Sequence, residues 1–178
     1  QPQLPGGLGA LAEPPLAGVP SLAEMTRGAL NVLDEDQDGF FLMVEGGAID
    51  WASHDRQPGR LIEEVVGFVE AVATVQDWIA AHGGWERNLL VVTADHETGY
   101  LGGPAPLSEP PPGCLASLPL EPRGRGALPG LRFNAGDHTN ALVPLLAAGV
   151  GVDRLQMAAT GSDPVRGPWL ENVEIGRA

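Results

Sequence analysis

The stretch from residue 41 to residue 54, FLMVEGGAIDWASH, constrains this chain more than any other. An apolar run at residues 40–44 predicts a buried strand that stops at an acid, Glu45. Asp50 and His54 follow at a spacing of four, so on one turn of helix their side chains point the same way. Carboxylate oxygens and imidazole nitrogens are zinc ligands, and a lone carboxylate can hold magnesium. The stretch therefore predicts a cation site, with a solvated loop carrying ordinary surface acids as the alternative.

Length and charge bound what the chain can do. Its 178 residues suffice for one domain with a hydrophobic core, and no stretch approaches the roughly 20 apolar residues of a membrane span. Acids outnumber bases 23 to 10, and every base is arginine, which argues against non-specific nucleic-acid binding. A single cysteine, Cys114, cannot form an internal disulfide. Because the chain starts at Gln1 with no signal peptide, we interpret it as a fragment whose upstream part is absent.

Two helices are predicted from periodicity and capping. Residues 1–20 hold five prolines and four glycines, which is typical of a linker or of the remnant of a missing half. Ser21 and Glu24 form a capping-box pattern that starts the first helix. The longest helix runs from about Gly59 to His82, where two glycines end it. His82 lies in the last turn, where an imidazolium is favourable, so we interpret it as structural.

The remaining segments alternate between predicted strands and loops. Residues 89–92 form a short apolar run that indicates a second buried strand. Residues 102–137 contain eight prolines and seven glycines and predict a long loop or flap. Residues 170–176 are predicted to form a last strand or helix turn. This alternation of strand, helix and strand favours an α/β sandwich with a largely parallel sheet.

Metal-type side chains gather where the predicted strands end. Three of the four histidines, His54, His96 and His138, lie within four residues of an aspartate. Asp95 and His96 directly follow a predicted strand, and open α/β sheets place ligands at the carboxyl ends of their strands. One Asp-His dipeptide indicates nothing, but several of them at strand ends predict a shared metal centre.

The motifs VEGGAIDWASH, TADHETG and HTNALVPL, in this order, resemble the metal-binding motifs of the alkaline phosphatases. The resemblance extends from about residue 19 to residue 177. It implies a three-layer α/β sandwich with a mostly parallel central sheet, of which residues 21–178 are the C-terminal part. It also implies two zinc ions, one magnesium ion and hydrolysis of phosphate monoesters at alkaline pH through a phosphoserine. By motif match Asp50, His54 and His138 bind the first zinc, Asp95 and His96 the second, and Glu45 the magnesium.

The resemblance also implies what this chain lacks. The family's serine nucleophile, phosphate-binding arginine and shared aspartate come from the N-terminal half, which nothing in residues 1–40 resembles. We therefore expect no catalytic nucleophile here and an inactive fragment, and we expect Ser53 to be a helix-surface hydroxyl. Phosphate monoesters and inorganic phosphate are the implied ligands. The family allows a homodimer and implies a periplasmic or secreted location.

Three other readings remain open. Asp34, Asp36, Asp38, Gly39 and Glu45 fit the calcium-loop pattern D-x-D-x-D-G-x5-E, which would make the chain a non-catalytic calcium-binding module. Against it, the ninth loop position is a leucine, and two glycines stand where an exit helix should start. A related phosphodiesterase of the same superfamily is the second reading. A structural zinc protein is the third, and the incomplete ligand sets argue against it.

Overall fold

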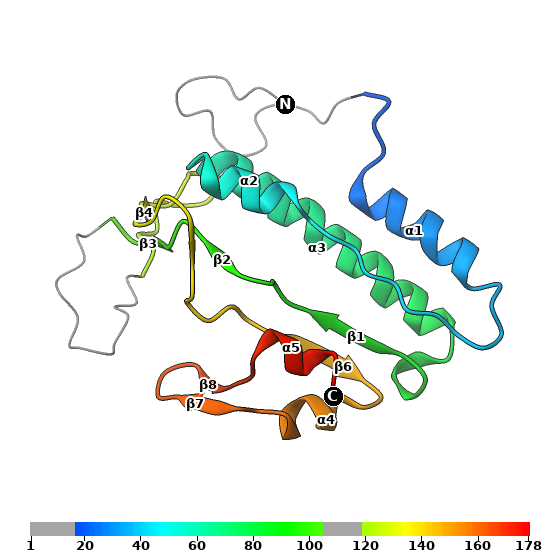
Figure 1. The fold of residues 1–178 in the computed structure, drawn as a ribbon. Coiled ribbons are helices and arrows are strands. Elements are labelled where there is room, and N and C mark those ends of the chain that lie inside the picture. The colour runs from blue at the N-terminus through cyan, green and yellow to red at the C-terminus, as the bar shows by residue number, and fades with distance from the viewer. Residues whose placement is uncertain (1–16, 105–118) are drawn as a thin grey trace. The chain divides into compact units, whose positions relative to one another are not determined.

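The computed structural model describes residues 17–104 and 119–178. The chain divides into two compact units, whose helices and strands are labelled in Figure 1. The first unit consists of Gln1–Val75 and Thr98–Ala141, and the second of Gln76–Glu97 and Leu142–Ala178. Most of the predicted N-terminal linker, the centre of the Pro/Gly-rich loop and Cys114 lie outside the described residues.

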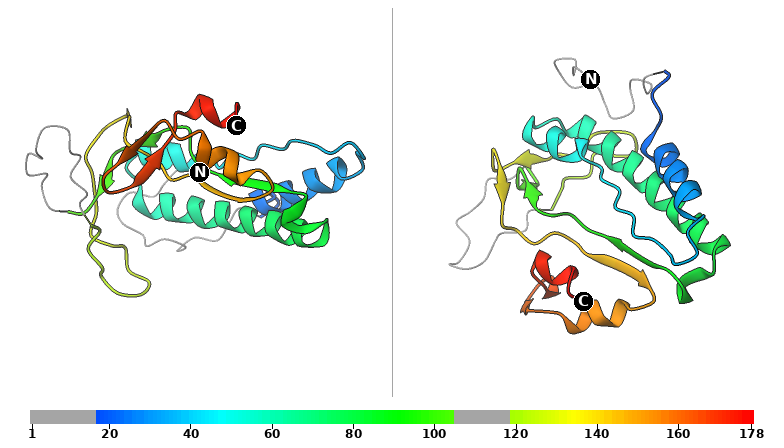
Figure 2. Two further views of the ribbon diagram at one scale, coloured as in Figure 1. Left: turned by 90° about the horizontal axis from the view of Figure 1, so that it is seen from below. Right: turned by 45° about the vertical axis from the view of Figure 1, so that its right-hand side comes forward.

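Helix α1 (Leu22–Leu33) begins where the capping box predicts. The Ser21 hydroxyl accepts a hydrogen bond from the Glu24 amide at 3.2 Å, and the Ser21 amide donates to the Glu24 carboxylate at 2.7 Å. These bonds satisfy two amides at a helix start, where the backbone has no partner of its own. They also lower the pKa of Glu24 below its ordinary value, the backbone bond from Ser21 being the larger cause. Thr26 and Leu30 form the buried face of α1, which lies next to α3 in two views (Figures 1 and 2).

Helix α2 (Ala48–His54) and the part of α3 (Pro58–Ala81) up to Val75 belong to the first unit. A Cβ on Gly46 would lie 3.0 Å from the Phe68 ring of α3 and 3.1 Å from the Ile49 side chain, so any larger residue here would have to displace these neighbours. Ala52 of α2 and Ala71 of α3 are each 3% exposed. The predicted long helix and the predicted helical turn are therefore both confirmed.

The strand predicted at residues 40–44 is absent: this segment has no regular secondary structure. Its side chains nevertheless alternate as on a strand, with Phe41 and Met43 exposed and Leu42 and Val44 partly covered. A strand exists only where a neighbouring strand pairs with its backbone, and the strand pairs of the described residues all use later segments. The apolar pattern alone could not supply that neighbour.

Short strand pairs complete the first unit. Strand β3 (Leu101–Gly102) pairs antiparallel with β4 (Arg132–Phe133), and Glu121 bridges Gly130. Strand β2 (Glu97–Thr98), of which Thr98 belongs to this unit, pairs with β5 (His138–Thr139). The described ends of the Pro/Gly-rich loop thus hold short pieces of strand that its composition did not predict.

The second unit is built on the predicted strand β1 (Leu89–Val92), which pairs antiparallel with β6 (Leu146–Gly149). The 3₁₀ turn η1 (Gly84–Glu86) and helix α4 (Val152–Met157) contact β6. Strands β7 (Gly161–Asp163) and β8 (Gly167–Trp169) form an unpredicted hairpin, and α5 (Asn172–Ile175) is the helical option of the last predicted element (Figure 2). Among the described residues the pairs β1–β6, β3–β4 and β7–β8 are antiparallel, so they do not show the mostly parallel sheet. None of the described helices combines the length and apolarity of a membrane span.

Candidate metal centre

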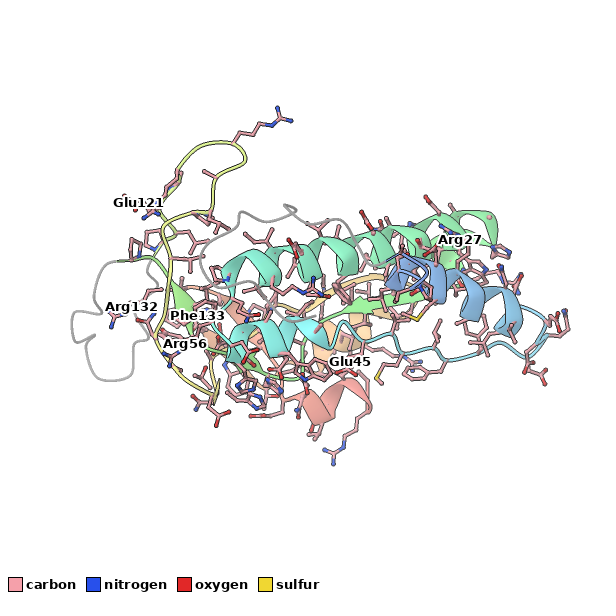
Figure 3. All side chains as sticks on the ribbon, turned by 90° about the horizontal axis from the view of Figure 1, so that it is seen from above. Arg27, Glu45, Arg56, Glu121, Arg132 and Phe133 are labelled. Carbon is pink, nitrogen blue, oxygen red and sulfur yellow. The ribbon has the colours of Figure 1, made fainter. Side chains whose placement is uncertain are left out.

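Gly99 lies where the candidate ligands of the first unit come together: it follows β2 and contacts both residues 133–137 and α2. Its amide donates to the Asp137 carbonyl at 3.2 Å, and its carbonyl accepts from the amides of Asn134 at 2.9 Å and Ala135 at 3.0 Å. A Cβ at this position would lie 2.7 Å from the Phe133 ring and 3.4 Å from the Ser53 carbonyl of α2. Because its φ is also +84°, glycine is required here twice, by conformation and by space. Figure 3 shows Phe133 and Arg56 beside the C-terminal end of α2.

Asp50, His54 and His138 meet at this junction. The Nε2 atoms of His54 and His138 are 3.0 Å apart. The Asp50 Oδ1 atom lies 3.5 Å from each of these two nitrogens. The side chains of Asp50 and His54 are about one-third exposed and that of His138 is 45% exposed, so solvent reaches the cluster from the His138 side.

These distances suit a shared metal ion. Ligand atoms about 2.0–2.1 Å from one tetrahedral zinc lie roughly 3.3–3.5 Å from each other, and the three separations fall at or just below that value. Two imidazoles and one carboxylate also match the donors that zinc takes in catalytic sites. The residues present therefore fit the ion that the sequence motifs imply.

Thr98 orients the carboxylate of the cluster. Its hydroxyl donates to Asp50 Oδ1 at 2.6 Å, a short bond of the kind formed with a charged acceptor. Thr98 lies in β2, which pairs with the strand that holds His138. One strand pair thus carries one candidate ligand and the group that orients another, a contact that the sequence motifs did not reveal.

Asp137 is a further acidic group at the cluster that our sequence analysis missed. One of its carboxylate oxygens and one ring nitrogen each of His54 and His138 lie within 4.8 Å of one another. The signal that could have found it was its position immediately before His138 in the motif.

Glu45, the predicted magnesium ligand, lies at the opposite end of α2 from Arg56 (Figure 3). A Cβ on Gly47 would lie 3.4 Å from its carboxylate, so the side chain folds over the start of the helix. Among the described residues Glu45 belongs to no group of three metal-type ligands.

Asp95 and His96, the predicted ligands of the second zinc, belong to the second unit and follow β1 as predicted. Their side chains lie 3.5 Å apart, from His96 Nε2 to Asp95 Oδ2. The Asp95 side chain is 83% exposed, whereas that of His96 is 29% exposed. The second unit thus carries an exposed carboxylate beside a partly buried imidazole.

Ser53 of the first unit and His82 of the second unit make local contacts instead. Ser53 is 6% exposed rather than on the helix surface, and its hydroxyl donates to the Ile49 carbonyl at 3.0 Å. The expectation of an exposed hydroxyl was wrong because α2 packs this face inward, beside Ala52. In the second unit the His82 ring stacks on Trp78 with centroids 4.3 Å apart, and its Nδ1 lies 2.7 Å from the Trp78 carbonyl.

Comparison with known proteins identifies the family. The sequence profile of the family described as alkaline phosphatase matches residues 8–115, which is more than half of the chain. The chain belongs to the alkaline phosphatase family. The resemblance of its sequence motifs is thereby confirmed.

This chain resembles several alkaline phosphatases and one phosphatase that is named after its substrate. Alkaline phosphatase 3 of Bacillus subtilis is 43% identical over 81 residues, which cover 46% of this chain and 17% of the relative. Streptomycin-6-phosphate phosphatase of Streptomyces griseus is 36% identical over 153 residues, covering 79% of this chain and 32% of the relative. A solved variant of the alkaline phosphatase from the Antarctic bacterium TAB5, with Mg bound in its M3 site, is 31% identical with a TM-score of 0.54 over 72% of this chain and 34% of its own. The chain spans about a third or less of the length of these relatives.

Proposed function

We propose that this chain is the metal-binding portion of a phosphatase that hydrolyses phosphate monoesters at alkaline pH. The observation that carries the proposal is the meeting of Asp50, His54 and His138 at separations of 3.0–3.5 Å. Family membership supports the substrate class, since the curated relatives are named alkaline phosphatases and streptomycin-6-phosphate phosphatase. Inorganic phosphate is the corresponding product.

Residues of this chain would contribute ligands to three metal ions. Asp50, His54 and His138 would hold one zinc, Asp95 and His96 would contribute to a second, and Glu45 would contribute to a magnesium ion. Bound at such a site, zinc supplies Lewis acidity toward phosphoryl oxygens and lowers the pKa of water. The protein's part is to fix the donors: Thr98 orients the Asp50 carboxylate, and the β2–β5 pair keeps His138 beside α2. The Mg-containing TAB5 structure supports a magnesium site in the family.

The serine nucleophile and the phosphoserine intermediate would belong to polypeptide upstream of this sequence. The relatives are three or more times longer than the matched region, which supports that division. We propose that the three-layer sandwich, with its mostly parallel sheet, is formed only with that polypeptide. The homodimer and the periplasmic or secreted location are proposals on the same basis.

Two alternatives are less well supported. A phosphodiesterase of the same superfamily would use similar metal ligands, but the family model that matches residues 8–115 is that of the alkaline phosphatases. A calcium module built on residues 34–45 would need a helix directly after the loop, whereas α2 begins only at Ala48.

Zinc affinity tests the proposal. We expect His138→Ala to weaken zinc binding by orders of magnitude, because it removes one of three donors from the centre. The control is His82→Ala, which removes a histidine that stacks on Trp78 and has no assigned metal. Competition with a chelator measures both variants, and equal affinities would refute the assignment.

A further inference from the structure

Asp137 lies at the candidate zinc centre without belonging to the ligand set of the motifs. We propose that Asp137 is a fourth side-chain ligand of the metal ion held by His54 and His138, one that an incoming phosphate oxygen displaces. The inference rests on the proposed function, because it takes His54 and His138 as zinc ligands. Its direct support is that donor atoms of Asp137, His54 and His138 all lie within 4.8 Å of one another.

The main chain holds the Asp137 carboxylate in place from two sides. The Asp137 carbonyl accepts from the Gly99 amide at 3.2 Å, which anchors the residue to the junction beside α2. Its Oδ1 atom accepts from the His138 amide at 2.8 Å, so the carboxylate folds back toward the histidine that follows it. A carboxylate offers two oxygens and about four lone-pair sites, so this bond leaves capacity for a cation.

Exposure explains why such a ligand could exchange. Asp137 and His138 are both exposed, whereas Asp50 and His54 are half-buried. The solvent-facing position of the centre therefore has a carboxylate beside it. Four side-chain ligands are the number found in closed zinc sites, whereas a catalytic site has three and one open position.

Charge balance permits the exchange. Asp50 and Asp137 together carry two negative charges, which neutralise a divalent ion. A phosphate oxygen that replaced Asp137 would keep an anion at the metal. The Asp137 carboxylate would then help to retain the ion when no substrate is bound, without excluding the phosphate substrate. The expected consequence is that Asp137 matters most to zinc binding when phosphate is absent.

Substitutions of Asp137 separate ligation from a purely structural role. Asn at this position keeps an oxygen that can accept from the His138 amide but loses the charge, whereas Ala loses both. Zinc affinity of the 178-residue chain would be measured by chelator competition, with and without saturating inorganic phosphate. Asp153→Asn, which makes the same change at an exposed residue in the first turn of α4, is the matched control.

We expect Asp137→Asn and Asp137→Ala to weaken zinc binding by about tenfold or more without phosphate, and Asp137→Glu to recover part of the loss. The deficit should shrink when phosphate is present, and Asp153→Asn should bind like the original chain. Wild-type affinity in Asp137→Asn with a loss only in Asp137→Ala would overturn the inference, since Asp137 would then merely hold the loop. If His138→Ala weakens binding while every Asp137 variant is normal, only this inference fails. If His138→Ala has no effect either, the proposed zinc centre fails with it.

Discussion

His54 and His138 are 84 positions apart in the sequence, yet their Nε2 atoms lie 3.0 Å from each other. Their rings are tilted by 43° with centroids 4.9 Å apart, so the contact is made by the nitrogens rather than by stacked faces. The two imidazoles come from the end of α2 and from β5, and both nitrogens are 3.5 Å from one carboxylate oxygen of Asp50. These two nitrogens and one oxygen are close enough together to bind one cation between them.

Thr98 should affect zinc binding at this cluster although it is not itself proposed as a metal ligand. We expect Thr98→Val to weaken zinc binding by roughly 10–100-fold, the usual cost of losing a partner that orients a metal ligand. The reason is that the 2.6 Å bond to Asp50 Oδ1 disappears while the shape of the side chain is kept. Thr98→Ser keeps the hydroxyl and should restore most of the affinity. A Val variant that binds zinc normally by chelator competition would show that Asp50 is held by other contacts.

The calcium-loop pattern at residues 34–45 should not bind calcium. The Asp38 amide donates to the Asp36 carboxylate at 2.9 Å, which is the bonding of an ordinary polar turn. Millimolar calcium should therefore leave the melting temperature unchanged, because a true site stabilises by RT ln(1 + [L]/Kd). Thermal denaturation with calcium or with chelator measures this. A rise of several degrees that disappears in Asp34→Ala would restore the calcium-module alternative.

The capping box of α1 should make stability depend on pH. Hydrogen bonds from Ser21 lower the pKa of Glu24, so the ionised carboxylate is favoured in the folded state. Such a group contributes stability that is fully present above the carboxyl pKa of the unfolded chain, about 4.3, and is lost as the pH falls through the lowered folded value. We expect Glu24→Gln to be less stable than the original chain at pH 7, with the difference narrowing below about pH 4. Melting temperatures across pH 3–7 would test this, and a constant difference would contradict it.

The structure separates what local sequence determines from what it does not. The start of α1 at Ser21, the long helix α3 and the strand β1 were predicted because capping, periodicity and apolar runs act within a few residues. The strand expected at residues 40–44 and the parallel sheet depend on partners far along the chain, which no local pattern supplies. The hairpin of β7 and β8 also escaped prediction.

The candidate site divides in the same way. The motifs predicted Asp50, His54 and His138, because ligand chemistry and family resemblance both depend on which residues stand at which positions. They did not indicate Thr98 or Asp137, whose positions at the cluster arise from the pairing of β2 with β5 and from the turn at Gly99. Supporting residues of this kind depend on three-dimensional contacts between segments that are distant in sequence.

The last prediction concerns catalysis by this chain alone. We expect negligible hydrolysis of an aryl phosphate at alkaline pH, even with zinc and magnesium supplied. Covalent catalysis needs a nucleophile that reaches the phosphorus atom, and positioning of the phosphate contributes much of the rate. Ser53, the serine beside the cluster, cannot attack as it stands, because it is 6% exposed and its hydroxyl donates to the Ile49 carbonyl. Release of the aryl alcohol, followed by absorbance, should be the same for the original chain and for His138→Ala. Robust turnover that His138→Ala abolishes would contradict the prediction and would mean that these 178 residues supply a nucleophile, either a side chain or a metal-activated water. Ser53→Ala would then be the first variant to assay, since its loss of activity would mean that α2 opens to release that hydroxyl.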